Sequence, residues 1–100
     1  MGTNLGYPKP EKVINEEYKK YVLSHPCLIC GNPQVDPDHL LARGRGSANQ
    51  NDYSLIPLCR KCHTERHTGG NEKLETKYRI TLWFEAWRLL AKWIEMGQRQ

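Results

Sequence analysis

Two pairs of cysteines constrain this chain more than any other feature. Each pair has two residues between its members, in Cys27-x-x-Cys30 and Cys59-x-x-Cys62. A chain of 100 residues buries only a modest core and often needs a metal or a disulfide to stabilise it. Two such pairs place four thiolates on two tight turns, which is the arrangement of a tetrahedral zinc site. The sequence therefore predicts structural Zn²⁺ bound by all four cysteines.

The redox alternatives fit these cysteines less well. Met1–Pro10 has no apolar segment of the kind found in secretion signals, and no apolar run approaches the ~20 residues of a membrane span. We therefore expect a cytoplasmic protein without membrane contact, in a compartment that keeps thiols reduced. A thioredoxin-like motif uses one such pair beside a βαβ pattern, and the sequence shows no such pattern.

The charge balance is basic, with 15 Lys and Arg against 11 Asp and Glu and a net charge of +4. This excess suits a polyanionic partner, although many small proteins reach it without one. The positions are more informative, because five basic residues fall in the central segment among residues that can do chemistry. They are Arg43, Arg45, Arg60, Lys61 and Arg66. We expect them to contact nucleic-acid phosphates.

The first third of the chain predicts an arm and a helix. Residues 1–9 contain Gly and Pro and lack periodicity, so we expect a flexible N-terminal arm. From Pro10 to Ser24 the pattern is helical, with proline in the first turn and with Ile14, Tyr18 and Val22 on one face. His25-Pro26 ends this helix.

The central third predicts two strands and a short helix. Cys27–Leu40 reads as a first cysteine turn followed by a strand, and Ala42–Asp52 reads as a loop because it holds glycine, serine and asparagine. Tyr53–Leu58 is a second strand, whose proline indicates an edge or a strand end. Arg60–His67 then forms a helix. The expected fold class is α+β, with a zinc-stabilised core over residues 10–70.

The last third predicts a helical extension over residues 71–100, packed on the core or on a partner. Gly69-Gly70 breaks the chain, and Asn71 is a suitable cap for the next helix. An apolar stripe then runs from Thr81 to Met96 at helical spacing. It contains three tryptophans, which we expect to pack in the core: Trp83, Trp87 and Trp93.

Histidines and an aspartate are interleaved with the cysteines. His63 and His67 are four residues apart on the expected helix, so both imidazoles project from one face, a spacing that chelates metals. Asp38 precedes His39 at the end of the first strand, where successive side chains point to opposite faces. One member of that pair can bind a metal while the other faces a different part of the site.

This set of groups suits phosphodiester hydrolysis. The reaction needs water as nucleophile, a base for its proton, and positive charge at the phosphate and the leaving oxygen. Imidazole titrates near neutral pH, so we assign His39 as the general base. Asp38, His63 and His67 are the expected ligands of one catalytic divalent metal, with Mg²⁺, Mn²⁺ or Ni²⁺ as candidates.

At this point the sequence resembles a known family. Cys27-x-x-Cys30, Asp38-His39-Leu40 and the run from Leu55 to His67 look like the HNH endonucleases of the ββα-metal superfamily, and most like phage-type zinc-containing members such as the Ref-like nucleases. The resemblance covers residues 18–67. It implies a small, treble-clef-like ββα-metal core with flanking helices, and the same roles for Asp38, His39, His63 and His67.

One position departs from the family pattern. The family's middle asparagine usually begins the second strand, nine residues before the first helical histidine, and Ser54 stands at that place. The asparagine orients the base histidine or constrains the loop. We expect Ser54 to take over this role, or Asn51 or Asp52 to reach in from the loop.

The resemblance also implies partners. These are double-stranded DNA, with RNA still open, and phage recombination or packaging proteins in a bacterial host. We expect a DNA-nicking enzyme with little sequence preference, acting as a monomer or homodimer. The alternative is a non-catalytic zinc module that binds nucleic acid or proteins in a phage assembly. A redox or zinc-storage role is a third reading.

Overall fold

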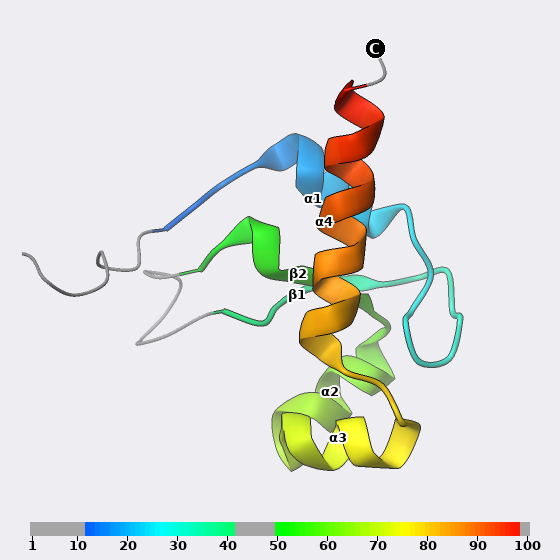
Figure 1. The fold of residues 1–100 in the computed structure, drawn as a ribbon. Coiled ribbons are helices and arrows are strands. Elements are labelled where there is room, and N and C mark those ends of the chain that lie inside the picture. Colours follow the sequence, from blue (N-terminus) through cyan, green and yellow to red (C-terminus); the bar gives the residue numbers. More distant parts are fainter. Residues whose placement is uncertain (1–11, 42–49, 99–100) are drawn as a thin grey trace, which may run out of the picture.

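The computed structural model describes residues 12–41 and 50–98 (Figure 1). In chain order the elements are α1 (Glu16–Leu23), β1 (Asp36–His39), the 3₁₀ helix η1 (Asp52–Ser54), β2 (Leu55–Leu58), α2 (Arg60–Gly69), α3 (Asn71–Tyr78) and α4 (Leu82–Gln98). This confirms a small α+β fold. The predicted loop over residues 42–52 and the predicted N-terminal arm lie largely outside the described residues.

The sheet has two antiparallel strands, and its register decides which side chains reach the site. Asp36 pairs with Leu58, Asp38 with Ile56, and His39 with Leu55. Every residue of β2 is buried, whereas in β1 Asp38 is the buried member. Because side chains alternate between the faces of a strand, Asp36 and Asp38 share one face and His39 lies on the other.

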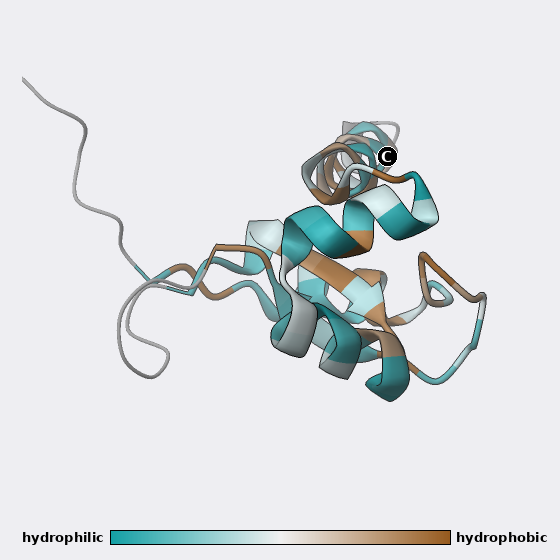
Figure 2. Cartoon of the chain, turned by 90° about the horizontal axis from the view of Figure 1, so that it is seen from below, coloured by the Kyte–Doolittle hydropathy of each residue, from teal (hydrophilic) through white to brown (hydrophobic). Residues whose placement is uncertain are grey.

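Two hydrophobic clusters hold the fold together, and α4 contributes to both. In the first, Leu82 and Ala86 of α4 pack with Ile56, Leu58 and three of the four cysteines, all but Cys30. In the second, Trp93 packs against a group formed by Tyr18, Val22 and Leu55. Figure 1 shows α4 running along the whole molecule in front of the sheet, and Figure 2 shows hydrophobic strand residues enclosed between the helices. The predicted C-terminal extension is therefore part of the core packing.

Helix α1 is shorter than the sequence pattern predicts. It begins at Glu16, because the Asn15 side chain caps it by accepting a hydrogen bond from the Tyr18 N–H at 2.9 Å. Upstream, Val13 forms a parallel bridge with Asn51 instead of a helical turn, and Ile14 is 62% exposed. The predicted helical start at Pro10 was wrong over residues 12–15, since pairing with a distant segment outweighs local periodicity.

The start of β2 also differs from the prediction. The predicted strand Tyr53–Leu58 loses its first two residues to η1, and the strand begins at Leu55. The Asn51 side chain accepts a hydrogen bond from the Tyr53 N–H at 2.8 Å, and this cap bends the chain into the 3₁₀ turn.

Gly70 is the single residue between α2 and α3. Gly70 has a φ of +87°, which favours glycine, and it both ends α2 and caps α3. Asn71 was predicted to be the cap, but it is the first residue of α3, and its side chain accepts a 2.7 Å hydrogen bond from Arg66 Nε. The predicted break at Gly69-Gly70 thus lies at the correct place, with a different residue as the cap.

The tryptophans of α4 divide between two environments. Trp93 is half-buried and lies edge-on to Tyr18, with ring centroids 5.1 Å apart, as core packing predicts. Trp83 and Trp87 are 51% and 62% exposed, so the prediction that they pack in the core was wrong. Each follows a buried residue of the helix, Trp83 after Leu82 and Trp87 after Ala86. Among the described residues, no helix combines the length and hydrophobicity needed to cross a membrane.

Candidate metal centres and active site

The four cysteines converge on one point. The Sγ atoms of Cys27, Cys30, Cys59 and Cys62 all lie within 4.8 Å of one another, and no disulfide joins them. Cys30 Sγ and Cys59 Sγ are 3.5 Å apart. Zinc–sulfur bonds of ~2.3 Å in a tetrahedron separate sulfur atoms by roughly 3.8 Å, so the cluster has the size that a zinc ion requires. The four residues can therefore hold a metal such as zinc.

Local structure supplies this convergence. The first pair lies on a turn closed by a 3.0 Å hydrogen bond from the Gly31 N–H to the Cys27 carbonyl, with Gly31 at φ +78°. A 3.1 Å bond from the Leu28 N–H to the Pro57 carbonyl attaches that turn to β2. The second pair lies at the start of α2, where Cys59 is the N-cap residue. The sheet and the helix thus bring the two pairs together.

The thiols influence one another's protonation. Burial raises the pKa of Cys27, but hydrogen bonds from the backbones of Cys30, Cys59 and Ile29 outweigh it and lower that pKa to about 7. Burial and the neighbouring thiols raise the pKa of Cys62 above its usual range. Several negative thiolates cannot share this volume without a cation, and a bound metal supplies that charge.

A second group of possible metal ligands is formed by one residue of β1 and two residues of α2. Asp38 Oδ1 is 3.7 Å from His63 Nε2 and 3.5 Å from His67 Nε2, and the three ligand atoms form a compact group within 4.8 Å. The two imidazole rings stand 4.6 Å apart, one helical turn from each other. Asp38 is 3% exposed and His67 is 59% exposed. One carboxylate and two imidazoles, open on one side, are a donor set that divalent transition metals accept.

Two charged residues that the sequence analysis did not assign to this group also join it. Arg66 Nη1 lies 2.7 Å from Asp38 Oδ1, and its side chain is 10% exposed. Asp36 Oδ2 lies 3.5 Å from His63 Nδ1 and 2.9 Å from Arg60 Nε. Asp36 could have been found from its position two residues before Asp38 on the same strand face. Arg66 gave no comparable signal.

His39 occupies a separate position on the opposite face of β1. Its Nε2 lies 2.8 Å from Asp52 Oδ1, and its side chain is 15% exposed. The other oxygen of Asp52 accepts a 2.8 Å hydrogen bond from the Asn15 N–H at the start of α1. Asp52 is 6% exposed, so both of its oxygens are used within the fold. A carboxylate held in this way fixes the orientation of the imidazole.

Three residues were predicted to orient His39, and they have different hydrogen-bond partners. They are Ser54, Asn51 and Asp52. The Ser54 hydroxyl donates to the Asn51 carbonyl at 2.7 Å and accepts from the Leu41 N–H at 3.0 Å. The Asn51 side chain caps η1. Asp52 is the residue whose side chain reaches His39. Of the three alternatives in the sequence analysis, the geometry favours Asp52.

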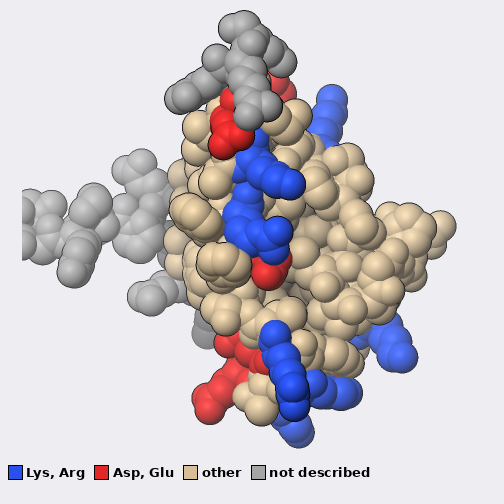
Figure 3. Space-filling view, turned by 45° about the vertical axis from the view of Figure 1, so that its right-hand side comes forward, with Lys and Arg blue, Asp and Glu red and all other residues tan. Residues whose placement is uncertain are grey.

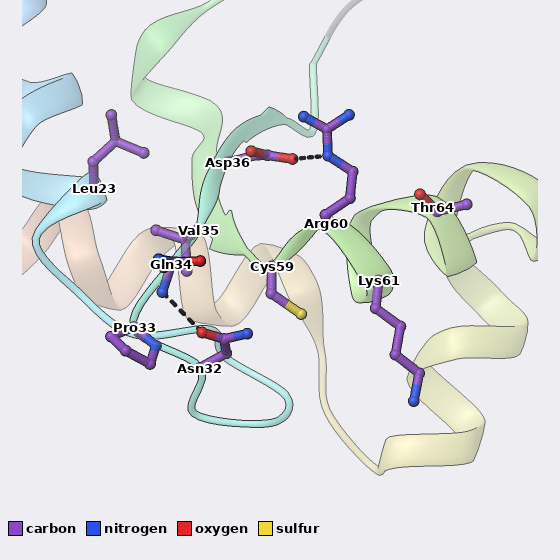
Figure 4. Close-up of a pocket in the computed structure, with 10 residues that line it drawn as sticks. All are labelled: Leu23, Asn32, Pro33, Gln34, Val35, Asp36, Cys59, Arg60, Lys61 and Thr64. Carbon is purple, nitrogen blue, oxygen red and sulfur yellow. Dashed lines mark hydrogen bonds and ion pairs between the residues drawn. The ribbon is translucent and has the colours of Figure 1, made fainter.

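Basic side chains border an open hollow beside these groups. The hollow has a volume of about 970 Å³, and Figure 4 shows Arg60, Lys61 and Asp36 around it, with Arg60 paired to Asp36. Arg60 is 84% exposed, and Lys61 is also exposed. Arg43 and Arg45 lie outside the described residues. Nucleic-acid contact by these residues and by Arg66 stays a prediction, and Arg66 is already bound to Asp38 and Asn71.

The cysteine cluster generates a first prediction. Cys59→Ser should remove the zinc and abolish cooperative unfolding, because structural zinc contributes on the order of 10 kcal/mol of apparent binding energy in small domains. Native mass spectrometry gives the zinc content, and thermal melting followed by circular dichroism gives the stability. His25→Ala is the matched control, since His25 lies outside the cluster. A Cys59→Ser protein with unchanged, chelator-resistant melting contradicts the tetrathiolate assignment.

Comparison with known proteins identifies the family. No solved structure matches the chain. Among curated proteins, it is 41% identical over 73 residues to "Uncharacterized protein YdfU" of Escherichia coli (strain K12), an alignment covering 71% of this chain and 21% of that relative. The chain therefore spans about a fifth of the relative's length. Residues 3–97 match the family described as "Protein of unknown function (DUF968)", and the chain belongs to that family.

Proposed function

We propose that this chain is a metal-dependent DNA endonuclease of the HNH type, which nicks the backbone with little sequence preference. One observation carries the proposal. The strand residues Asp38 and His39 point to opposite faces of β1, one into a group with His63 and His67 and the other into a pair with Asp52. A candidate metal site and a candidate base thus stand on neighbouring residues of one strand.

The order of elements supports assignment to the ββα-metal superfamily. Strands β1 and β2 form an antiparallel pair, and α2 follows β2 directly. Asp38 comes from the first strand, whereas His63 and His67 come from the helix. The cysteine cluster joins the start of α2 to the turn before β1. We propose that this is an HNH core stabilised by structural zinc.

His39 is suited to take a proton from water. Its Nε2 faces the Asp52 carboxylate, which accepts hydrogen bonds, so Nε2 carries the hydrogen and Nδ1 is left as the basic nitrogen. When His39 takes the proton, the charge on Asp52 stabilises the imidazolium. His39 is the proposed general base and Asp52 its positioning residue. Ser54 and Asn51 support the backbone around them.

The remaining groups organise the phosphate. A divalent ion such as Mg²⁺, Mn²⁺ or Ni²⁺ at Asp38, His63 and His67 supplies positive charge at the scissile phosphate and the leaving oxygen. Asp36 Oδ2 lies 3.5 Å from Nδ1 of His63 without a hydrogen bond between them, so it acts on that imidazole through its charge. Arg60 and Lys61 are exposed in the first turn of α2, the helix that carries His63 and His67, where they can contact the DNA backbone.

One observation favours the second candidate, a non-catalytic zinc module that binds nucleic acid or protein. Arg66 already neutralises the buried Asp38 carboxylate at 2.7 Å, as an internal counterion would in a protein that needs no metal there. The zinc cluster alone is sufficient to stabilise such a module. The approach of two imidazoles to the same carboxylate oxygen favours the nuclease, because neither contact is needed for that neutralisation.

The nuclease proposal predicts cleavage of supercoiled plasmid. The wild-type chain should convert it to open circles with at least one of Mg²⁺, Mn²⁺ or Ni²⁺. His39→Ala should lose at least ~100-fold in rate, the usual contribution of a general base. His25→Ala should retain activity, since His25 lies in neither group. If folded, zinc-loaded wild type cuts with none of these metals, the binding module becomes the better account. If His39→Ala cuts as well as wild type, His39 is not the general base.

The Asp52 assignment is tested by Asp52→Asn. The asparagine amide can donate to Nε2, which moves the imidazole hydrogen to Nδ1 and leaves no base toward water. We expect nicking to fall on the order of 100-fold, with metal affinity unchanged. Asn15→Ala is the control, because it removes the cap of α1 but keeps the backbone N–H that Asp52 binds. Equal losses in both variants would indicate that Asp52 acts only through stability.

A further inference from the structure

Helix α4 has two apolar stripes, and the core covers one of them. Leu82, Ala86, Leu89 and Trp93 face inward. A second stripe lies one residue further along, about 100° around the helix. It consists of Trp83, Trp87, Leu90 and Ile94; the tryptophans and Ile94 are 51%, 62% and 47% exposed, and Leu90 is half-buried because it also packs against the core. The largest exposed apolar patch of a small protein is often an interaction surface, and this row is a candidate for one.

We propose that this stripe binds the same stripe of a second copy of the chain, with the two α4 helices antiparallel. A two-fold axis between positions 88 and 89 places Trp83 opposite Ile94 of the second copy and Trp87 opposite Leu90. Every large aromatic side chain then meets a smaller aliphatic one. A parallel pair would place each tryptophan against its own counterpart. Antiparallel order also opposes the two helix dipoles.

The shape of the helix surface agrees with this register. A hollow of about 350 Å³ is lined by Trp87, Leu90, Ala91, Ile94 and Glu95. In the antiparallel pair, Trp83 of the second copy lies beside this hollow and can fill it. Phe84, 53% exposed, then lies near the small Ala91 of the other chain. Each copy thus offers a projecting aromatic end and a recessed aliphatic end.

The available area indicates a weak dimer. Aromatic side chains present about 150–250 Å² each, so three half-exposed aromatics and Ile94 contribute on the order of 400 Å² per copy. Two copies would bury about 800 Å², less than the ~1,200 Å² of the smallest standard interfaces, so the pairing is weak and transient. The charged residues Glu85, Arg88 and Lys92 lie on the adjoining polar side of α4. Figure 3 shows such charged groups gathered in a column, with uncharged surface beside it.

This pairing does not depend on the proposed nuclease activity. It is tested by sedimentation equilibrium on the full zinc-loaded chain from low micromolar to millimolar concentration. The average mass of wild type should rise toward that of a dimer. Trp87→Glu should stay monomeric, whereas Lys92→Glu, a charge change on the polar side of the same helix, should associate like wild type. Circular dichroism and zinc content establish that each variant is folded.

The antiparallel register has its own test. Trp83→Glu and Ile94→Lys should each abolish association, and the double variant should regain it because the two introduced charges then face each other across the pair. A double variant that stays monomeric overturns the register. Wild type that stays monomeric at millimolar concentration, or Trp87→Glu that associates like wild type, overturns the dimer and assigns the stripe to a different partner.

Discussion

The four cysteine thiols join parts of the chain that are otherwise held by a small core. Cys27 and Cys30 lie on the turn before β1, while Cys59 and Cys62 lie at the start of α2. His63 follows Cys62 directly, so any ion that draws the thiols together also fixes the helix that presents the two histidines. The geometry around Asp38 therefore depends on a separate cluster of side chains.

The register of the sheet is the second feature that positions the candidate site. Because β1 alternates its side chains, Asp38 is buried against α2 while His39 turns toward η1 and Asp52. Asp52 in turn receives the N–H of Asn15, so the beginning of α1 is linked to the candidate base. Small displacements of α1 or of η1 would be transmitted to His39 through a single carboxylate.

Sequence patterns predicted those parts of the molecule that depend on local spacing. The cysteine pairs, the His63–His67 turn and the alternation at Asp38-His39 all follow from the periods of turns, helices and strands. The start of α1 was not predicted, because it is decided by pairing between Val13 and Asn51, which are far apart in sequence. Apolar periodicity likewise identified α4 but could not distinguish its inward-facing stripe from the exposed one.

The partners of the site were the least predictable part. Nothing in the local sequence distinguishes Arg66 from the other basic residues of the central segment, yet its guanidinium is the one bound to Asp38. Asp52 was one of three residues proposed to orient His39, with Ser54 and Asn51 as the others, and only the fold of η1 decides among them. Such contacts depend on the tertiary arrangement, which residue spacing alone does not predict.

The most direct test of the account counts metal ions. Zinc-loaded protein is titrated with Mn²⁺ while electron paramagnetic resonance reports the free ion and native mass spectrometry reports the zinc. The account predicts one zinc that resists exchange and one further divalent ion per chain, with His63→Ala losing the second ion and keeping the zinc. A wild-type chain that binds no second ion, or a His63→Ala chain that binds it equally well, would contradict the candidate active site.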